Sequence, residues 1–218
     1  MKAQIKSLVK THPLWKCFHP PKDSTLPPVK GLRPVFVGSI LGEIGDIRRF
    51  SSPKHLRAYA RFHLIEGKFP KRVAEKLSSW NFHLHNVFWL WVNEQMPKYK
   101  HPWHSLYLWR KAKEIRAHLE IEPRKIRDKQ GHSRIIYDYT LKHLDSRAKR
   151  WAASQLLNYL WDLWQKLECN EDLEFWYSNS SWPIYFKRVE KELKDGLMEF
   201  LKAEILKRQR SAPELGEG

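Results

Sequence analysis

The chain has 218 residues, 42% of them hydrophobic and eleven of them tryptophan, so it can bury a sizeable core, which excludes a disordered protein. Its 40 Lys and Arg exceed its 24 Asp and Glu, giving a net charge of +16 that favours nucleic acid as a partner over a merely basic soluble protein. Cys17 and Cys169 are too few for a disulfide scaffold, and no apolar run approaches the roughly eighteen residues that span a membrane.

The N-terminal segment is predicted to be a short helix followed by a linker. Ile5, Leu8 and Val9 mark the apolar side of the helix, which residues 11–13 interrupt. Residues 19–30 are rich in proline and break any helix. The charged start shows no signal peptide, so we expect a cytoplasmic protein without a membrane partner.

The stretch from Gly31 to Phe50 predicts a helix that ends in a tight turn. Pro34 suits the first helical position, because its missing N–H costs nothing there, and Gly45 permits a left-handed turn at the end. A second helix is expected to begin at Pro53, capped by Ser52. The apolar face of the first helix is assigned to Val35, Ile40, Leu41 and Ile44.

This helix, turn and helix suit a nucleic-acid backbone. Gly38 and Gly42 let a second backbone come close, and a glycine-containing hairpin before a helix N-terminus presents free N–H groups to a phosphate. Helix-hairpin-helix units hold nucleic acid in this way without reading bases. In the alternative, a helical corner, the glycines serve only packing. The candidate phosphate-binding residues are Gly31, Arg33, Gly45, Arg48 and Arg49.

The same stretch resembles the C-terminal domain of the Piv/MooV-type insertion-sequence transposases. The shared pattern is a glycine hairpin, a small-residue helix and a run of the form GDI-x-RF-x-S-x-x-x-L-x-x-YAG. This chain has LGEIGDIRRF, ending at Phe50, and then Ser52, Leu56 and Tyr59-Ala60. It departs at Arg33, which replaces the second hairpin glycine, and at Arg61, which replaces the last glycine of the pattern. An arginine at position 33 can itself meet a phosphate.

Members of this family are recombinases with an N-terminal RuvC-like domain, and some are guided by a bridge RNA. The resemblance implies that residues 2–15 are the end of a connecting helix, and that the RuvC-like domain would lie upstream of Met1. It implies no cofactor in this chain, since Mg²⁺ belongs to the absent domain. The partners it implies are DNA, a guide RNA and a separate RuvC-like catalytic chain. We also expect a homo-oligomer.

A nucleophilic serine is expected in this family where the present chain has Glu66. Ser78 and Ser79 lie further along and are the candidate catalytic residues if the loop folds back. A serine nucleophile needs a base or positive charge nearby, and Lys71 and Arg72, also candidate nucleic-acid-binding residues, supply charge. The alternative is that the two serines cap the next helix.

That helix is predicted over residues 80–95, where the family has an Asn-x-x-Leu-Arg signature. Asn81 and Leu84 match it, and His85 replaces the arginine. The expected core residues are Phe82, Trp89, Val92 and Met96. Histidine pairs at 83 and 85 and at 101 and 104 have no clustered cysteines or carboxylates nearby, so we assign no metal site.

The next third of the chain concentrates the positive charge. Between Lys98 and Arg150 there are fifteen Lys and Arg against six Asp and Glu. A helix is predicted over residues 103–120, followed by a basic connection over residues 124–139. One face of the helix is assigned to Leu108, Ala112, Ile115 and Leu119, and the other to Arg110, Lys113 and Arg116. Tyr137, Tyr139 and Trp151 suit either base stacking or the core.

A long helix is predicted over residues 142–167, with an apolar stripe. The stripe consists of Ala152, Leu156, Tyr159, Leu160, Leu163 and Leu167. This helix resembles the closing helix of the family, in which a basic segment precedes a long aromatic-rich run. Arg147, Lys149 and Arg150 match that segment and are expected to contact the nucleic-acid backbone.

Residues 168–218 lie outside the resemblance. Four acids precede a serine-rich turn, and a last helix is expected to start near Pro183 and to end before a tail at 211–218. Its apolar residues Tyr185, Val189, Leu193, Leu197, Leu201 and Ile205 suit packing on the body or on a partner chain.

We therefore expect an all-α fold with a helix-hairpin-helix unit packed on longer amphipathic helices. The predicted parts are residues 1–18, a linker at 19–30, the transposase C-terminal domain at 31–167 with the unit at 31–60, and residues 168–218. The leading hypothesis is a nucleic-acid-binding transposase domain acting in DNA transposition and recombination. One alternative is a recombinase fragment that borrows catalytic acids from another chain. The other is an inactive or domesticated helical protein-interaction module.

Overall fold

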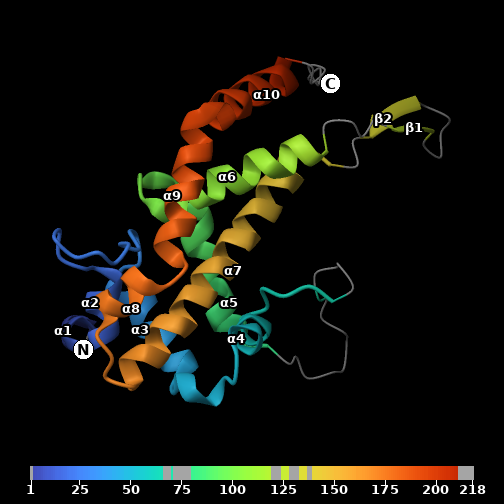
Figure 1. The fold of residues 1–218 in the computed structure, drawn as a ribbon. Coiled ribbons are helices and arrows are strands. Elements are labelled where there is room, and N and C mark those ends of the chain that lie inside the picture. The colour runs from blue at the N-terminus through green and yellow to red at the C-terminus, as the bar shows by residue number, and fades with distance from the viewer. Residues whose placement is uncertain are drawn as a thin grey trace, which may run out of the picture.

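The computed structural model describes residues 2–65, 70, 80–118, 124–127, 133–136 and 139–210, and these residues are largely helical. The longest helix, α7 (Leu141–Glu168), runs through the middle of the molecule with other helices packed around it (Figure 1). Its 28 residues span about 42 Å. The predicted all-α class is confirmed.

The apolar stripe predicted for α7 is also confirmed. Thr140 caps the helix, since its Oγ1 accepts a hydrogen bond from the N–H of His143 at 3.2 Å. Buried residues recur every three or four positions and form a broad face toward α4 and α6. They include Leu144, Ala148, Ala152, Leu156, Tyr159, Leu160 and Leu163. Neither α7 nor any other described helix is long and apolar enough to cross a membrane.

The N-terminal residues form two helices, α1 (Lys2–Thr11) and α2 (Pro13–Phe18), separated where the sequence predicted an interruption. Val9 is buried against α3, and its Cγ2 lies 3.1 Å from the point where a Cβ on Gly38 would stand. Glycine at 38 therefore makes room for the Val9 side chain, but a Cβ on Gly42 would meet nothing within 4 Å, so the predicted approach of a second backbone to both glycines is not found. Leu8 is 70% exposed, so its assignment to the apolar side is wrong.

The segment 19–30 contains no helix, as predicted, yet it belongs to the packed core. Val29 is fully buried, and its N–H donates to the carbonyl oxygen of Phe18 at 2.9 Å. The indole N–H of Trp91 donates to the carbonyl oxygen of Lys30 at 3.0 Å. These contacts fix the segment between the N-terminal helices and the centre of the molecule.

Helix α3 (Pro34–Ile44), the 3-10 turn η1 (Ile47–Arg49) and α4 (Pro53–Tyr59) reproduce the predicted helix, turn and helix. Gly45 ends α3 with a φ of +64°, in the region that favours glycine. The hydroxyl of Ser52 caps α4. The local sequence signals at Pro34, Gly45 and Ser52 were therefore sufficient to predict where these two helices begin and where α3 ends.

The buried face of α3 differs from the predicted one. Val37, Ile40 and Ile44 are fully buried, at the three- and four-residue spacing of one helix face. Val35 is 66% exposed, and its assignment to this face is wrong, because α1 and α5 cover the side that carries Val37.

Helix α5 (Phe82–Leu90) continues into a π-helical turn, η2 (Trp91–Gln95), and a short 3-10 turn, η3 (Met96–Lys98). Asn81 caps α5, because its side-chain oxygen accepts the N–H of Leu84 at 2.8 Å. Val92 and Met96 are buried as predicted. Phe82 is 57% exposed and is not the expected core residue, since it occupies the first turn of the helix.

Helix α6 (Pro102–Ala117) lies beside α7, and the chain between them contains strands β1 (Arg124–Arg127) and β2 (Ser133–Ile136). The strands pair antiparallel, with Arg124 opposite Ile136 and Arg127 opposite Ser133. The sequence predicted only a basic connection over residues 124–139; its described part contains these two strands, and the body of the fold remains helical.

The C-terminal region consists of α8 (Leu173–Asn179), α9 (Trp182–Glu192), the π turn η4 (Leu193–Leu197) and α10 (Met198–Arg210). The predicted single helix is broken at Gly196, whose φ is +106°. The helices on both sides of this bend pack on α6. Leu193, Leu197 and Leu201 are buried there. The chain itself therefore covers the apolar stripe that the interaction-module hypothesis would use to bind a partner.

Candidate nucleic-acid interface

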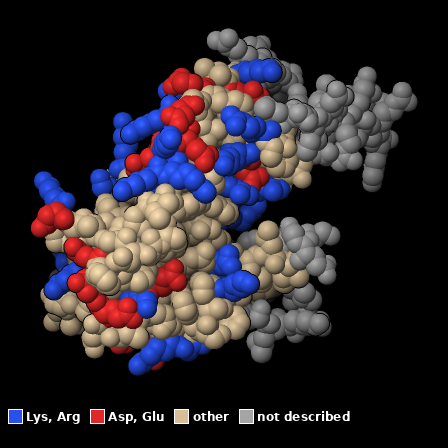
Figure 2. Space-filling model, in the orientation of Figure 1, with Lys and Arg blue, Asp and Glu red and all other residues tan. Residues whose placement is uncertain are grey.

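Lys and Arg side chains gather along α6 and α7 where the two helices lie side by side. Figure 2 shows Lys and Arg side chains in the upper half of the molecule, interspersed with Asp and Glu. We call these residues the α6–α7 basic seam; they are Arg110, Lys111, Lys113, Arg116, Lys142, Arg147, Lys149 and Arg150. The three residues predicted on α7 are thus brought together with four on α6.

Glu114, on α6, holds two arginines of the seam. Its side chain is only 4% exposed, and the Nε atoms of Arg110 and Arg147 lie 2.8 and 2.9 Å from its two carboxylate oxygens. The Nδ1 atom of His118 is 4.0 Å away. A buried carboxylate needs charged partners, so this contact fixes both guanidinium groups and joins α6 to α7.

Asp145, on α7, holds two lysines of the seam in the same way. The Nζ atoms of Lys111 and Lys149 lie 2.6 and 2.8 Å from its oxygens, and the hydroxyl of Tyr107 donates to it. Burial raises the pKa of Asp145, but the hydrogen bonds from Lys111, Lys149 and Tyr107 outweigh burial and leave that pKa below its usual value. Burial and the bond to Asp145 raise the pKa of Tyr107. The carboxylate therefore stays ionised and the phenol stays protonated.

Each of these carboxylates faces two permanent cations, so each cluster keeps a net positive charge. Besides the four cations that bind Glu114 and Asp145, the seam contains Lys113, Arg116, Lys142 and Arg150. His143 lies among them: burial first, and then the charges of Arg150 and Arg147, lower its pKa. The positive side chains are thus held in place before any partner arrives, which reduces the entropy cost of binding an anion.

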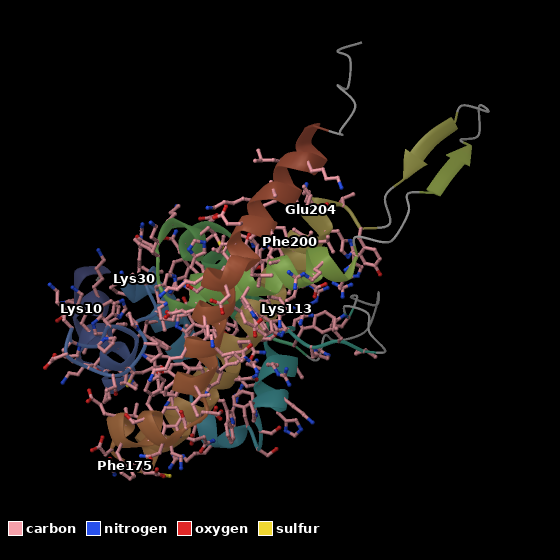
Figure 3. The ribbon with its side chains drawn as sticks, turned by 45° about the horizontal axis from the view of Figure 1, so that its top comes forward. Lys10, Lys30, Lys113, Phe175, Phe200 and Glu204 are labelled. Carbon is pink, nitrogen blue, oxygen red and sulfur yellow. The ribbon has the colours of Figure 1, made fainter. Side chains whose placement is uncertain are left out.

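The C-terminal helices reach the outer side of α6. Glu192 on α9 accepts a hydrogen bond from the indole N–H of Trp109 at 2.8 Å and lies 3.1 Å from the Nζ of Lys113. The guanidinium of Arg116 lies over the ring of Phe200 on α10, 4.9 Å from its centroid. Figure 3 shows Lys113 and Phe200 on the same part of the molecule. The predicted basic face of α6 is therefore partly covered by α9 and α10.

The glycines predicted to cradle a phosphate have local structural roles. Gly31 has a φ of +87°, and a Cβ there would stand 2.7 Å from the Cβ of Gln95, so close packing requires glycine. Gly45 ends α3, and a Cβ on Gly42 or Gly45 would meet nothing within 4 Å. Arg33 is exposed at the N-cap of α3 and makes no side-chain capping bond.

Arg48 and Arg49, in η1, are exposed but engaged. Arg48 makes a forked contact with Asp46, with Nη2 to Oδ2 at 2.9 Å. The guanidinium of Arg49 lies 4.7 Å from the centroids of both Phe50 and Tyr59. Their turn packs on the far end of α7, where Gln165 donates to the carbonyl of Ile47.

Arg48 and Arg49 therefore lie at the opposite end of α7 from Arg147, Lys149 and Arg150. The seam uses residues 142–150 of α7, whereas Ile47 and Phe50, in and next to η1, accept hydrogen bonds from Gln165 and Trp161. Some sixteen residues of helix between Lys149 and Gln165 correspond to about 24 Å. The candidate catalytic Ser78 and Ser79, together with Lys71 and Arg72, lie outside the described residues. The alternative interpretation was that the two serines cap the next helix, but the residue that caps α5 is Asn81.

A cavity of about 460 Å³ lies beside η1 at that far end of α7. Trp161 and Trp176 line it together with Arg48, Lys166 and Asp162. Burial raises the pKa of Asp162, whose Oδ2 accepts the indole N–H of Trp182. Acidic partners already neutralise both cations, Asp46 for Arg48 and Glu171 for Lys166, so this cavity lacks the charge surplus that a phosphate requires.

The histidines do not assemble into a metal site in the described part of the chain. His85 is buried, with its Nδ1 3.1 Å from the carbonyl oxygen of Ala60. His101 is buried beside Trp91, and burial lowers its pKa to about 4. No group of three or more His, Cys, Asp or Glu side chains among the described residues is close enough to hold a metal ion.

The two carboxylates that organise the seam were not predicted from the sequence. The only local signal was the four-residue spacing from Arg110 to Glu114 and from Asp145 to Lys149. The contacts between helices, from Glu114 to Arg147 and from Lys111 to Asp145, join residues more than thirty positions apart. Such contacts depend on how α6 and α7 pack.

No family model matches the chain, and neither a curated protein nor a solved structure matches it. Function is therefore inferred from the geometry of the seam and from the sequence pattern between Gly31 and Arg61.

Proposed function

We propose that this chain binds nucleic acid through its phosphates, with the α6–α7 basic seam as the principal contact surface. The observation that carries the proposal is the ratio of two cations to each carboxylate, one of them buried (Glu114) and the other partly buried (Asp145). Arg110 and Arg147 share Glu114, and Lys111 and Lys149 share Asp145. A phosphate approaching either cluster meets a fixed surplus of positive charge with hydrogen-bond donors.

The seam suits an extended polyanion better than a small one. It follows each of two helices for about two turns, from Arg110 to Arg116 on α6 and from Lys142 to Arg150 on α7. Successive phosphates of one strand are separated by a few ångströms, so a row of cations contacts several of them at once. The net charge of +16 adds a long-range attraction that speeds association.

The biological setting that we propose is DNA transposition or recombination by an insertion-sequence element. The support for this setting is the run from Gly31 through Arg61, which resembles the C-terminal domain of the Piv/MooV-type transposases. In this setting the chain supplies the grip on DNA or guide RNA. The Mg²⁺-binding acids of the reaction would come from a RuvC-like domain or a separate chain.

The test measures binding of the purified chain to short duplex DNA and to a structured RNA by fluorescence anisotropy across a salt series. The proposal predicts binding at low salt whose constant falls linearly with salt on logarithmic axes, because each contact releases counterions. Absence of binding to both polymers at low salt would refute it.

A further inference from the structure

The strands β1 and β2 form a ribbon that extends away from the body of the molecule. Figure 1 shows them beyond the ends of α6 and α7, on the side opposite α1 and α2. The two strands pair with each other along their whole length, and among the described residues neither strand shows extensive contact with a helix. The ribbon leaves the body between Arg116 and Lys142, at one end of the α6–α7 basic seam.

The eight strand residues have an unusual composition for an unsupported ribbon. Four are Lys or Arg, three are Ile and none is acidic. Because successive residues of a strand belong to opposite faces, the register places basic positions on both faces. Arg124 and Arg134 share one face, and Lys125 and Arg127 share the other. The acids nearest in sequence, Glu120, Glu122, Asp128 and Asp138, all fall outside the strands.

The dimensions of the ribbon match the major groove of B-form DNA. A strand of four residues is about 13 Å long, and paired strands lie about 4.8 Å apart. The major groove is about 12 Å wide and 8.5 Å deep and admits a two-stranded ribbon. The corresponding groove of duplex RNA is deep and narrow and does not.

The residue types in the ribbon also distinguish DNA from RNA. Arginine and lysine are the side chains that bond guanine O6 and N7 at the floor of the major groove. Aliphatic groups such as isoleucine suit the C5 methyl of thymine, which uracil lacks. A ribbon that carries both basic and aliphatic residues therefore fits a groove that offers both guanine O6 and N7 and thymine methyl groups.

We propose that the β1–β2 ribbon inserts into the major groove of duplex DNA while the α6–α7 basic seam holds the flanking phosphates. This inference rests on the proposed function and identifies its partner as double-stranded DNA. Arg116 and Lys142, the seam residues nearest the ribbon, are placed to contact the phosphates at the edge of the occupied groove.

The first arm of the test changes only the nucleic acid. The unaltered protein is titrated with a duplex DNA rich in A·T pairs, with the same duplex carrying deoxyuridine in place of thymidine, and with duplex RNA of the same sequence. The inference predicts roughly tenfold tighter binding to the thymidine duplex than to the RNA. The deoxyuridine duplex, which keeps every phosphate, should bind several-fold more weakly than the thymidine duplex.

The second arm changes the ribbon. In the ribbon variant, Arg124, Lys125, Arg127 and Arg134 are each replaced by Gln, and in the matched control Lys6, Lys10, Lys16 and Lys22 are each replaced by Gln. The control removes the same charge from the opposite end of the molecule, where Figure 3 labels Lys10. Protection of guanine N7 from dimethyl sulfate reports on occupation of the major groove.

The inference predicts that the unaltered protein and the control protect N7 and prefer DNA. The ribbon variant should lose both properties and keep a weaker binding that still depends on salt. Equal binding of all three duplexes by the unaltered protein, or unchanged N7 protection in the ribbon variant, overturns the inference and leaves phosphate binding by the seam intact. If no nucleic acid binds at low salt, the proposed function fails and the inference fails with it.

Discussion

The Nε atom of Arg147 on α7 lies 2.9 Å from a carboxylate oxygen of Glu114 on α6, and the same carboxylate binds Arg110. One acidic side chain therefore joins the two helices and positions two arginines of the basic seam. Because Glu114 is 4% exposed, its ionised carboxylate is stabilised by these two arginines. The carboxylate in turn holds each arginine in position. Stability and the proposed binding surface thus share one residue.

Replacing Glu114 with Gln should destabilise the fold and strengthen polyanion binding. The amide keeps the shape but leaves two arginines without their counter-charge, at a cost of about 2 kcal/mol or more. Urea denaturation measures the loss, and Glu199→Gln, at a 76% exposed side chain on α10, is the control with an expected change below about 0.5 kcal/mol. Equal stability of the two variants would contradict the role given to Glu114.

Two glycine substitutions should have opposite effects. Gly31→Ala places a Cβ 2.7 Å from that of Gln95 at a φ of +87°, so we expect a loss of about 2 kcal/mol. Gly42→Ala adds a methyl group within α3 that meets nothing within 4 Å, so we expect a gain of up to about 1 kcal/mol. Thermal unfolding of the two variants measures both, and a stable Gly31→Ala protein would rule out this packing.

Acid should destabilise the protein through His101. Burial, aided by the nearby charges of His104 and Lys30, lowers the pKa of His101 to about 4, whereas in the unfolded chain it is about 6.5. Between pH 4 and pH 6.5 the folded state therefore binds fewer protons than the unfolded chain. The contribution of His101 to the free energy of unfolding is full above pH 6.5 and is lost as the pH falls to 4. The difference corresponds to about 3 kcal/mol.

The comparison of His101→Phe with the unaltered protein isolates this contribution. The variant should lose less stability between pH 7 and pH 4 than the unaltered protein when both are unfolded with urea. His83→Gln, at an exposed position of α5, serves as the control for histidine removal. Parallel pH profiles for His101→Phe and the unaltered protein would count against a buried neutral His101.

The two thiols should react at very different rates. Cys17 is buried, and burial raises its pKa to about 11, whereas Cys169 is exposed at the end of α7. A disulfide reagent should therefore modify one thiol promptly and the second only as the protein unfolds. In Cys169→Ser the prompt reaction should disappear, and its persistence would show that Cys17 is accessible.

Elements defined by local chemistry were predictable from the sequence. Pro34, Gly45 and Ser52 mark boundaries that each depend on a few neighbouring residues, and the stripe of α7 is long enough to define one face. Leu8, placed on the apolar side of its helix, and Phe82, expected in the core, are both exposed, because periodicity shows which residues share a face but not how much of that face a neighbour covers.

The candidate site was predictable only in part. The basic residues on α7 were identified, but Glu114, which binds Arg147, and Lys111, which binds Asp145, belong to a helix that is distant in sequence. The bend at Gly196 also escaped prediction, since apolar residues four positions apart favour one continuous helix. Contacts between helices decide these features, and a single sequence carries no direct signal for them.

The central claim is most directly tested by the salt dependence of DNA binding in two charge-matched variants. One combines Arg116→Gln with Lys142→Gln in the seam, and the other combines Lys10→Gln with Lys16→Gln at the opposite end of the molecule. Neither Arg116 nor Lys142 forms an ion pair with a carboxylate in the described part of the chain, but Arg116 packs on Phe200 of α10, so urea denaturation is used first to verify that the seam variant is folded. The slope of the logarithm of the binding constant against the logarithm of the salt concentration counts phosphate contacts.

The account predicts that the seam variant loses about 1 unit of slope for each phosphate contact removed, while the N-terminal variant keeps the slope of the unaltered protein. Equal losses in both variants would mean that net charge alone attracts the nucleic acid and that the seam is not the site. That result would contradict the account.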